Sequence, residues 1–349
     1  MSGAAMEAGR TLAMGQDEAV GGGRQSVEAP FGRALSRLGQ SHPDIVGLTA
    51  DLGKYTDILP FRDAFPDRFF NVGMAEQNLV AVAAGLARTG KVPFATTYGV
   101  FATRRAYDFV AIALAHSNLN VKIVAGLPGL TTGYGGTHQA IEDLALMRMI
   151  PGLTVIDPCD ATEIEAATAA IAEHHGPVYM RLLRGSVPVV FEPGYRFEIG
   201  KARRLREGLD VGIISTGFMT ERALDAADAL QRQGISAGVL HVPTVKPFDA
   251  EAVAEFAGSV DHVVTAENHV VVGGLASLVV ESLFDAGIAK KVTRIGLPDH
   301  YIECGAVPTL QAKYGLTTEA VIATIAALDH DPEKWKPVFG KDHGQPKAS

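Results

Sequence analysis

Residues 70–78 read FNVGMAEQN, and they join an apolar stretch that predicts a buried strand to an amphipathic stretch that predicts a helix. The carboxylate in this segment is Glu76, in the first turn of the expected helix. Because helix N-termini stabilise anions, the simplest interpretation is a residue that helps to cap its helix. A strand that leads directly into a helix is also typical of parallel sheets, where ligands bind beyond the carboxyl ends of the strands.

The alternation of strands and helices continues on both sides of this segment. We expect helices at residues 30–42, 74–88, 100–116, 140–149 and after a capping box at 160–163, and strands at 45–48, 69–72, 92–96, 121–125, 154–156 and 178–182. Short β-branched strands between amphipathic helices predict a parallel sheet that is covered on both faces. The helix after Glu76 is rich in small residues, which suits a close subunit contact as well as packing on its own sheet.

This pattern breaks between Val187 and Gly208, where prolines and glycines are followed by a run of charge. A second alternation follows, with expected strands at 211–215, 236–242, 262–266 and 291–295 and helices at 221–233 and 275–285. We therefore predict an α/β fold of two α/β domains, at residues 29–195 and, for the smaller one, 205–330. Residues 1–28, which lack periodicity, are expected to form a disordered tail.

The composition is that of an ordinary globular protein, with 349 residues, 47% of them hydrophobic and 20% charged. No apolar run approaches the roughly 20 residues of a membrane helix, and the N-terminus lacks the apolar segment of a signal peptide, so we expect a cytoplasmic protein without a membrane partner. The net charge of -8 disfavours a nucleic-acid partner. Cys159 and Cys304 are far apart without metal-ligand spacing, so we expect reduced structural cysteines and no zinc site.

Further polar and aromatic residues follow other expected strands. Asp51 comes after the strand at 45–48, and Tyr98 and Phe101 come after the strand at 92–96. His138 lies in a Thr-His-Gln triplet that follows residues 126–136, a loop with five glycines. Each has a plainer interpretation, as a turn residue, a core aromatic or an incidental loop histidine. Together they predict a ligand site at the carboxyl edge of the sheet.

This arrangement resembles the pyrimidine-binding domain of thiamin diphosphate enzymes, namely transketolases, deoxyxylulose phosphate synthases and the beta chains of 2-oxo acid dehydrogenases. Glu76 matches the glutamate of their V-G-x-x-E motif, which hydrogen-bonds a ring nitrogen of the cofactor's aminopyrimidine and moves its proton. The resemblance implies that Phe101 stacks on the aminopyrimidine, with Tyr98 beside it. It also implies a cofactor-facing role for Asp51.

The later part of the chain resembles the transketolase C-terminal domain. The matching segments read STG at 215–217, VPTVKPFD at 242–249 and AENH at 266–269, the last followed by GGL at 273–275. The likeness thus runs from about Pro30 to about Ala327, which is nearly the whole expected folded region.

The same resemblance implies substrate contacts for several residues. His138 matches a histidine that contacts the donor substrate and takes part in catalysis, and Arg33 and Arg184 match arginines that grip a sugar phosphate. Tyr134 stands four residues before His138, where transketolases and deoxyxylulose phosphate synthases carry an aspartate that reads a substrate hydroxyl. We expect Tyr134 to line the substrate site and to change which hydroxyl pattern is accepted.

One element of the family is missing from the sequence. No Gly-Asp-Gly segment is followed some thirty residues later by an asparagine, which is the family's site for magnesium and the cofactor's diphosphate. We therefore expect a split enzyme, in which an N-terminal transketolase subunit holds the diphosphate of thiamin diphosphate and most of the magnesium contacts. This chain is then expected to self-associate as a dimer within a heterotetramer.

The resulting expectation is the C-terminal subunit of a two-component transketolase that acts on sugar phosphates. The alternatives are the beta subunit of a 2-oxo acid dehydrogenase and a deoxyxylulose phosphate synthase-like enzyme. Two arginines of the phosphate-binding type, Arg33 and Arg184, favour sugar phosphates over 2-oxo acids. A third interpretation, from a different class of protein, is a catalytically silent scaffold or regulatory subunit.

Overall fold

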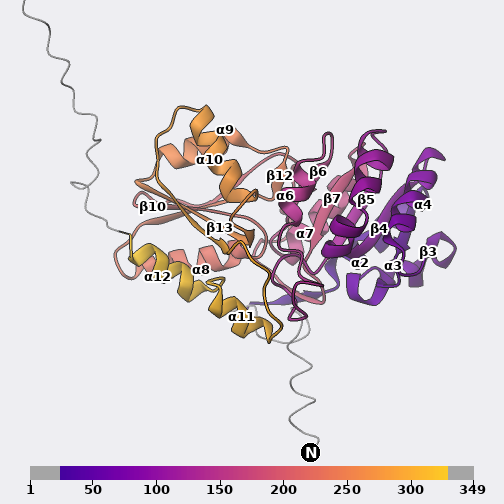
Figure 1. Ribbon diagram of the computed structural model, residues 1–349, viewed down its shortest axis with the longest axis horizontal. Helices are drawn as coiled ribbons and strands as arrows, with labels where there is room; N and C mark the ends of the chain where they lie inside the picture. The colour runs from indigo at the N-terminus through magenta and orange to yellow at the C-terminus, as the bar shows by residue number, and fades with distance from the viewer. Residues whose placement is uncertain (1–23, 329–349) are drawn as a thin grey trace, which may run out of the picture.

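Two α/β domains lie side by side in the computed structural model, which describes residues 24–328 (Figure 1). The expected fold class is confirmed. The sheet of the first domain has the order β12-β6-β7-β5-β4-β2-β3. Its strands are β2 (Ile45–Thr49), β3 (Phe69–Asn71), β4 (Val92–Tyr98), β5 (Lys122–Gly126), β6 (Thr154–Ile156), β7 (Val178–Leu182) and β12 (Thr244–Lys246). All neighbours pair in parallel except β12, which is antiparallel to β6.

Helices cover both faces of this sheet, as the buried strands predicted. They are α2 (Pro30–Ser41), α3 (Leu59–Ala64), α4 (Glu76–Arg88), α6 (Asp143–Arg148) and α7 (Ala161–Glu173), with 3-10 turns η1 (Gly53–Thr56) and η2 (Pro66–Arg68). On β2, Ile45 packs in one cluster with residues of α2 and α7, whereas Val46 packs in another with residues of α4. This alternation along the strand places the carboxyl ends of the strands, rather than their faces, within reach of a ligand.

The helix expected at residues 100–116 is interrupted. It consists of a π-helical turn η3 (Phe101–Arg105), the short α5 (Tyr107–Phe109) and a second π-helical turn η4 (Val110–Ala115). A π-helical turn holds more residues than an α-helical turn, so it changes which side chains face the same way, and such turns are frequent at functional sites. Here the first π-helical turn begins at Phe101 and ends at Arg105.

Two expectations about the ends of the first domain were wrong. Strand β3, which precedes Glu76, was expected to be buried. It is instead the edge strand of the sheet, and the side chain of Phe70 in it is 41% exposed. Residues 26–28, expected to belong to a disordered tail, instead form β1 (Ser26–Glu28), which pairs antiparallel with β8 (Ser186–Pro188). Residues 1–23 lie outside the described residues.

The second domain has a five-stranded sheet in the order β14-β13-β10-β11-β9. Its elements are β9 (Arg203–Arg206), β10 (Val211–Ser215), β11 (Ala237–His241), β13 (His262–Val270), β14 (Val292–Leu297), α8 (Met219–Gln231), α9 (Ala250–Gly258), α10 (Leu275–Asp285), α11 (Val307–Lys313) and α12 (Thr318–Ala326). Helices α8 and α12 cover one face and α9 and α10 the other (Figure 1). The basic residues around Arg203 form the edge strand β9, which is antiparallel to β11.

The two domains are joined by more than a linker. Strand β12 belongs in sequence to the second domain, yet it completes the sheet of the first. The sequence did not predict this three-residue strand, because its length gives no periodic signal. Between residues 24 and 328 there is no helix of the length and apolarity needed to cross a membrane.

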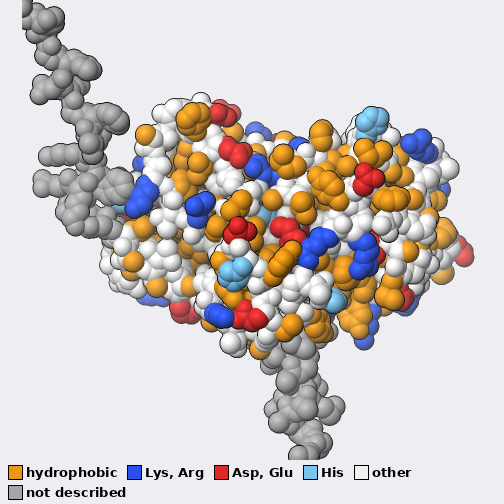
Figure 2. All heavy atoms as spheres, in the orientation of Figure 1, with side chains coloured by type: hydrophobic (Ala, Val, Ile, Leu, Met, Phe, Trp, Pro, Cys, Tyr) orange, Lys and Arg blue, Asp and Glu red, His pale blue; other side chains and the backbone are white. Residues whose placement is uncertain are grey.

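The outer surface of the first domain carries several large exposed apolar side chains just before α4 and on the helical segments that follow β4. Met74 is 77% exposed, Ile112 59% and Phe109 37%. On the face drawn in Figure 2, hydrophobic side chains gather over the first domain, right of centre. Of the small residues in α4, Ala83 and Ala84 are buried in the core, whereas Gly85 is exposed and a side chain there would meet open space. The helix therefore keeps one small face free.

Candidate functional site

Glu76 is the first residue of α4, and its side chain is 1% exposed. Its Oε2 accepts a hydrogen bond of 2.7 Å from Nη1 of Arg105. The preceding residue, Ala75, offers no side-chain cap to the helix. The carboxylate is therefore bound to a side chain from η3, in addition to lying at the positive end of a helix.

Arg105 also covers an aromatic ring. Its guanidinium carbon lies 4.2 Å from the ring centroid of Phe101, which is partly buried, while the Arg105 side chain itself is 46% exposed. The π-helical turn brings both residues to the same side of η3, next to the start of α4. A planar, hydrogen-bond-donating group thus rests on Phe101 and reaches Glu76 at the same time.

A cluster of rings surrounds Phe101. The centroid of Tyr98 lies 5.8 Å from that of Phe101, and the centroid of His138 lies 5.5 Å from Phe101 and 5.4 Å from Tyr134. Tyr98 closes strand β4 and is buried, and burial raises the pKa of its phenol to about 12. The structure therefore brings together four residues that the sequence proposed separately.

His138 is the polar member of this cluster. Its Nδ1 lies 2.9 Å from Oγ1 of Thr137. Burial, and then the positive charge of Arg105, lower the pKa of the imidazole below its ordinary value. A histidine with a lowered pKa is neutral near pH 7, so one ring nitrogen donates a hydrogen bond and the other accepts one.

Arg184 lies at the side of the aromatic cluster. It is 8% exposed, and its guanidinium carbon is 5.7 Å from the ring centroid of Tyr55. Its Nε has no hydrogen-bond partner among residues 24–328. Arg184 and Leu127 line a cleft together with Phe218 of the second domain. A buried cation with an unused N–H group is suited to bind an anion.

Two predicted residues make none of the contacts described above. Arg33 is exposed on the first turn of α2. Asp51 is also exposed, with a left-handed φ of 59°, and its Oδ1 accepts a hydrogen bond of 2.9 Å from Asn71. That geometry is the one expected of a turn residue between β2 and β3.

The sequence did not single out Arg105 or Tyr55. Arg105 could have been noticed as one of two consecutive arginines, with Arg104, close behind Phe101 in a mainly apolar segment. Arg104 holds the loop instead, since its Nη1 donates to the carbonyl of Gly136. Tyr55 carried no sequence signal, because its position depends on how η1 folds back over β5.

Cys159, Glu163 and His241 lie closer together than their sequence spacing suggested, with their potential metal-binding atoms within 4.8 Å of one another. His241 comes from the second domain, so no local motif could show this cluster. The groups already bind one another or their neighbours: Glu163 Oε2 accepts from His241 Nε2 at 2.8 Å and from the Cys159 backbone N–H at 2.8 Å. Both cysteines are free, and Cys159 is buried.

Comparison with known proteins agrees with this geometry. The sequence matches the family models of the transketolase pyrimidine binding domain over residues 24–189 and of the transketolase C-terminal domain over residues 200–321. An uncharacterised transketolase family protein of Sinorhizobium fredii is 56% identical over 309 residues, which cover 88% of this chain and 90% of that protein. A 6-deoxy-6-sulfo-D-fructose transketolase subunit of Clostridium sp. strain MSTE9 is 44% identical over 289 residues, 82% of this chain and 89% of that one.

A solved structure is similar over the same region. It is described as a split gene transketolase in an inactive beta4 tetramer, and it matches with a TM-score of 0.80 and 46% sequence identity, covering 86% of this chain and 97% of that chain. The two domain models together cover most of the present chain. The chain therefore belongs to the transketolase family, as a pyrimidine-binding domain followed by a transketolase C-terminal domain.

Proposed function

We propose that this chain is the pyrimidine-binding subunit of a two-component transketolase, which transfers a two-carbon ketol unit between sugar phosphates. The observation that carries the proposal is the arrangement of Glu76, Phe101 and Arg105. A buried carboxylate and a partly buried ring face lie close enough for one planar donor to engage both. This is the pair of groups that a flat heterocycle with a basic ring nitrogen requires.

The residues present fit the pyrimidine end of thiamin diphosphate, because the Arg105 guanidinium already occupies the place of a planar donor. Phe101 would stack on the ring, with Tyr98 packed beside it, and Asp51 would face the cofactor from the end of β2. Glu76 would hold and move a proton at the ring nitrogen. When bound, the cofactor supplies the nucleophilic carbon that takes up the two-carbon unit.

The substrate contacts come from the rim of the same cluster. His138, kept neutral by its surroundings, would donate a hydrogen bond to a substrate oxygen and take part in the proton transfers of the donor. Arg184 would bind the distal phosphate with the help of its unpartnered Nε–H group, with Arg33 as a second, exposed cation. Tyr134 would present a phenol where related enzymes present a carboxylate, which favours a different hydroxyl pattern.

A partner subunit is required by this proposal. The sequence contains no Gly-Asp-Gly segment, so the diphosphate and most of the magnesium contacts are assigned to an N-terminal transketolase subunit. Two relatives support a divided enzyme, since one is named a subunit and the other a split gene transketolase. The tetrameric state of the latter and the exposed apolar side chains near α4 support self-association of this chain.

Calorimetry tests the proposal directly. We expect the isolated chain to bind thiamin diphosphate negligibly with magnesium present, and a mixture with a subunit carrying the Gly-Asp-Gly segment to bind it and to transfer ketol units. Micromolar, magnesium-dependent binding by this chain alone would contradict the divided site. Because one relative acts on a sulfosugar, the assay should include ketoses with a distal sulfonate as well as a distal phosphate. Efficient decarboxylation of pyruvate by the mixture would favour the 2-oxo acid dehydrogenase class. Absence of all activity in the mixture would favour a catalytically silent subunit.

A further inference from the structure

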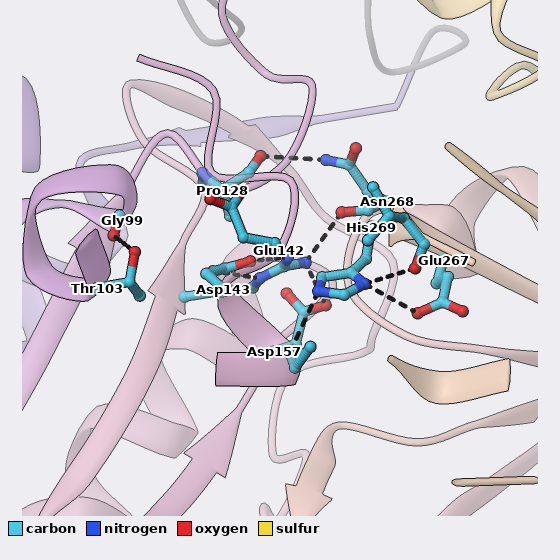
Figure 3. A network of polar contacts seen from close by, with 12 residues as sticks. Gly99, Thr103, Pro128, Glu142, Asp143, Asp157, Glu267, Asn268 and His269 are labelled. Atoms are coloured by element: carbon cyan, nitrogen blue, oxygen red, sulfur yellow. Dashed lines mark hydrogen bonds and ion pairs between the residues drawn. The ribbon is translucent and has the colours of Figure 1, made fainter. Parts of the chain in front are cut away.

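The second domain makes several hydrogen bonds to residues 126–139, the glycine-rich loop and the triplet after it, which include Tyr134 and His138. Asn268, near the end of β13, is 2% exposed, and its side-chain amide makes two hydrogen bonds to this loop. Nδ2 donates to the carbonyl of Pro128 at 3.1 Å, and Oδ1 accepts from the backbone N–H of Leu130 at 2.8 Å. Figure 3 shows Asn268 reaching across to Pro128. Donor and acceptor of one amide are thus both used on one short stretch of backbone.

Gly129, between these two bonds, makes the close approach possible. It has a left-handed φ of +55°, and a Cβ atom built there would lie 2.3 Å from the Asn268 carbonyl oxygen and 2.4 Å from its side-chain amide. Any other residue would push the two segments apart. The close approach therefore requires glycine at position 129.

Asn268 is itself held from the first domain. Arg181, a fully buried residue of β7, donates from Nη1 to the carbonyl of Asn268 at 3.2 Å and to Asp157 at 3.1 Å, and from Nε to Asp143 at 2.9 Å. Two carboxylates and a carbonyl therefore fix this guanidinium in place. The backbone of Asn268 is anchored to the central sheet, and its side chain is anchored to the loop.

The second domain makes two further hydrogen bonds to this loop, at positions closer to Tyr134. Gln311 of α11 donates from Nε2 to the carbonyl of Leu130 at 3.0 Å, and the backbone N–H of Gly305 donates to the carbonyl of Gly133 at 3.0 Å. Gly133 immediately precedes Tyr134. Within the loop, Gln139 closes the turn by donating to the carbonyl of Thr132 at 3.0 Å.

We infer that Asn268, assisted by Gln311, is a positioning residue that sets the place of Tyr134 and His138 over the aromatic cluster. It touches neither Glu76 nor Phe101 in the described structure, so it acts on the substrate side of the site alone. The effect on the loop follows from the contacts themselves. The effect on catalysis rests on the proposed function, because it assumes that His138 contacts substrate.

Hydrogen exchange of the full-length chain, without partner or cofactor, tests the structural part. We expect Asn268→Ala to speed exchange of the amides of residues 129–139 by about tenfold or more, while those of β4 and β5 exchange as in the wild type. Gln311→Ala should act on the same amides more weakly. His241→Ala is the matched control, because it removes an interdomain hydrogen bond to Glu163 and does not touch the loop. Unchanged loop exchange in both Asn268→Ala and Gln311→Ala would overturn the inference.

Kinetics of the reconstituted pair test the catalytic part. Asn268→Ala should raise the KM for the ketose donor about tenfold and lower kcat several-fold, because His138 is displaced, with the apparent affinity for thiamin diphosphate within about twofold of wild type. Equal losses in KM, kcat and cofactor affinity would mean general destabilisation and would overturn the positioning role. If the wild-type pair shows no ketol transfer, the proposed function fails, yet the exchange experiment still decides whether Asn268 holds the loop.

Discussion

Nη1 of Arg105 lies 2.7 Å from Oε2 of Glu76, so the most deeply buried carboxylate of the candidate site is bound by one of its most exposed cations. The Arg105 side chain is 46% exposed and that of Glu76 is 1% exposed. An exposed arginine can leave at small cost, because water solvates it once it is released. In the isolated chain, Arg105 therefore supplies a hydrogen bond to the buried carboxylate of Glu76. A ligand with its own hydrogen-bond donor could replace Arg105 there.

The first prediction concerns Glu76→Gln. Glutamine keeps the shape and can still accept from Arg105, but it cannot exchange a proton as a carboxyl group does. We expect turnover of the reconstituted pair to fall by about a hundredfold or more. The free energy of unfolding should change by no more than about 1 kcal/mol.

Steady-state kinetics and urea unfolding measure the two effects. Glu281→Gln is a matched control, because Glu281 forms an exposed ion pair with Arg148 on the surface. A Glu76→Gln variant with normal turnover and lowered stability would return Glu76 to a purely structural role at the helix start.

The second prediction concerns Arg105→Met, which removes the donor that competes for Glu76 and uncovers part of Phe101. We expect the assembled enzyme to bind thiamin diphosphate a few-fold more tightly, since no ion pair has to be broken first. The isolated chain should lose roughly 1 kcal/mol of stability, because a buried carboxylate is left without its partner.

Cofactor titration followed by calorimetry checks the binding, and thermal unfolding checks the stability. Arg88→Met, at the exposed end of α4, is the control for loss of a surface arginine. Weaker cofactor binding in Arg105→Met would mean that Arg105 contacts the ligand rather than competing with it.

Much of this site could be predicted from the sequence because its residues follow strand ends. Tyr98, Phe101 and His138 lie at or just beyond the carboxyl ends of strands in a parallel sheet, and such ends meet at one edge whatever the details of the helices. The ring contacts among them bear out this expectation of proximity. Their chemical roles remain predictions.

What the sequence could not predict depends on long-range geometry. The Arg105 contact depends on a π-helical turn, which has the composition of an ordinary helix. Strand β12 and Asn268 act across the domain boundary, at separations where periodicity carries no information. Arg181 is a charged residue within a mainly apolar strand, and only the fold reveals the carboxylates of Asp143 and Asp157 around it.

The third prediction concerns the pH dependence of stability, through two buried groups at the domain interface. Burial raises the pKa of Glu267 to about 7, and burial, followed by the charge of Arg181, lowers the pKa of His269 to about 4. Nε2 of His269 accepts from the backbone N–H of Ala145, which requires an unprotonated nitrogen. Figure 3 shows both residues beside Asp143 and Asp157.

The two groups act in opposite directions. For His269 the folded state resists protonation, so stability is lost as the pH falls from about 6.5 towards 4. The pKa of Glu267 is about 7 in the folded state and about 4.3 in the unfolded state. Between these values only the folded state binds the proton, so stability is gained as the pH falls from about 7 to about 4.3. In the wild type these contributions largely cancel between pH 6.5 and 4.5.

Single variants should separate them. His269→Gln should lose less stability than wild type between pH 7 and pH 5, and Glu267→Gln should lose more, each by on the order of 1 to 3 kcal/mol. Urea unfolding at the two pH values, followed by circular dichroism, measures the slopes. Identical pH slopes in the wild type and both variants would show that neither group titrates with the shifted pKa.

The last prediction concerns Arg184→Ala and the nature of the substrate. The guanidinium is buried beside Tyr55, and its Nε has no partner among the described residues, so an incoming anion would complete its hydrogen bonds. A charge-assisted contact of this kind is worth roughly 2 to 3 kcal/mol, which corresponds to a rise in KM of about 30- to 150-fold for a ketose phosphate. An unphosphorylated donor such as hydroxypyruvate cannot make the contact, so its KM should change by less than about threefold. Arg203→Ala, in the edge strand β9, controls for the loss of a positive charge elsewhere on the chain. If both donors lose equally in Arg184→Ala, the arginine supports the aromatic cluster instead, because loss of packing against Tyr55 would disturb every substrate alike.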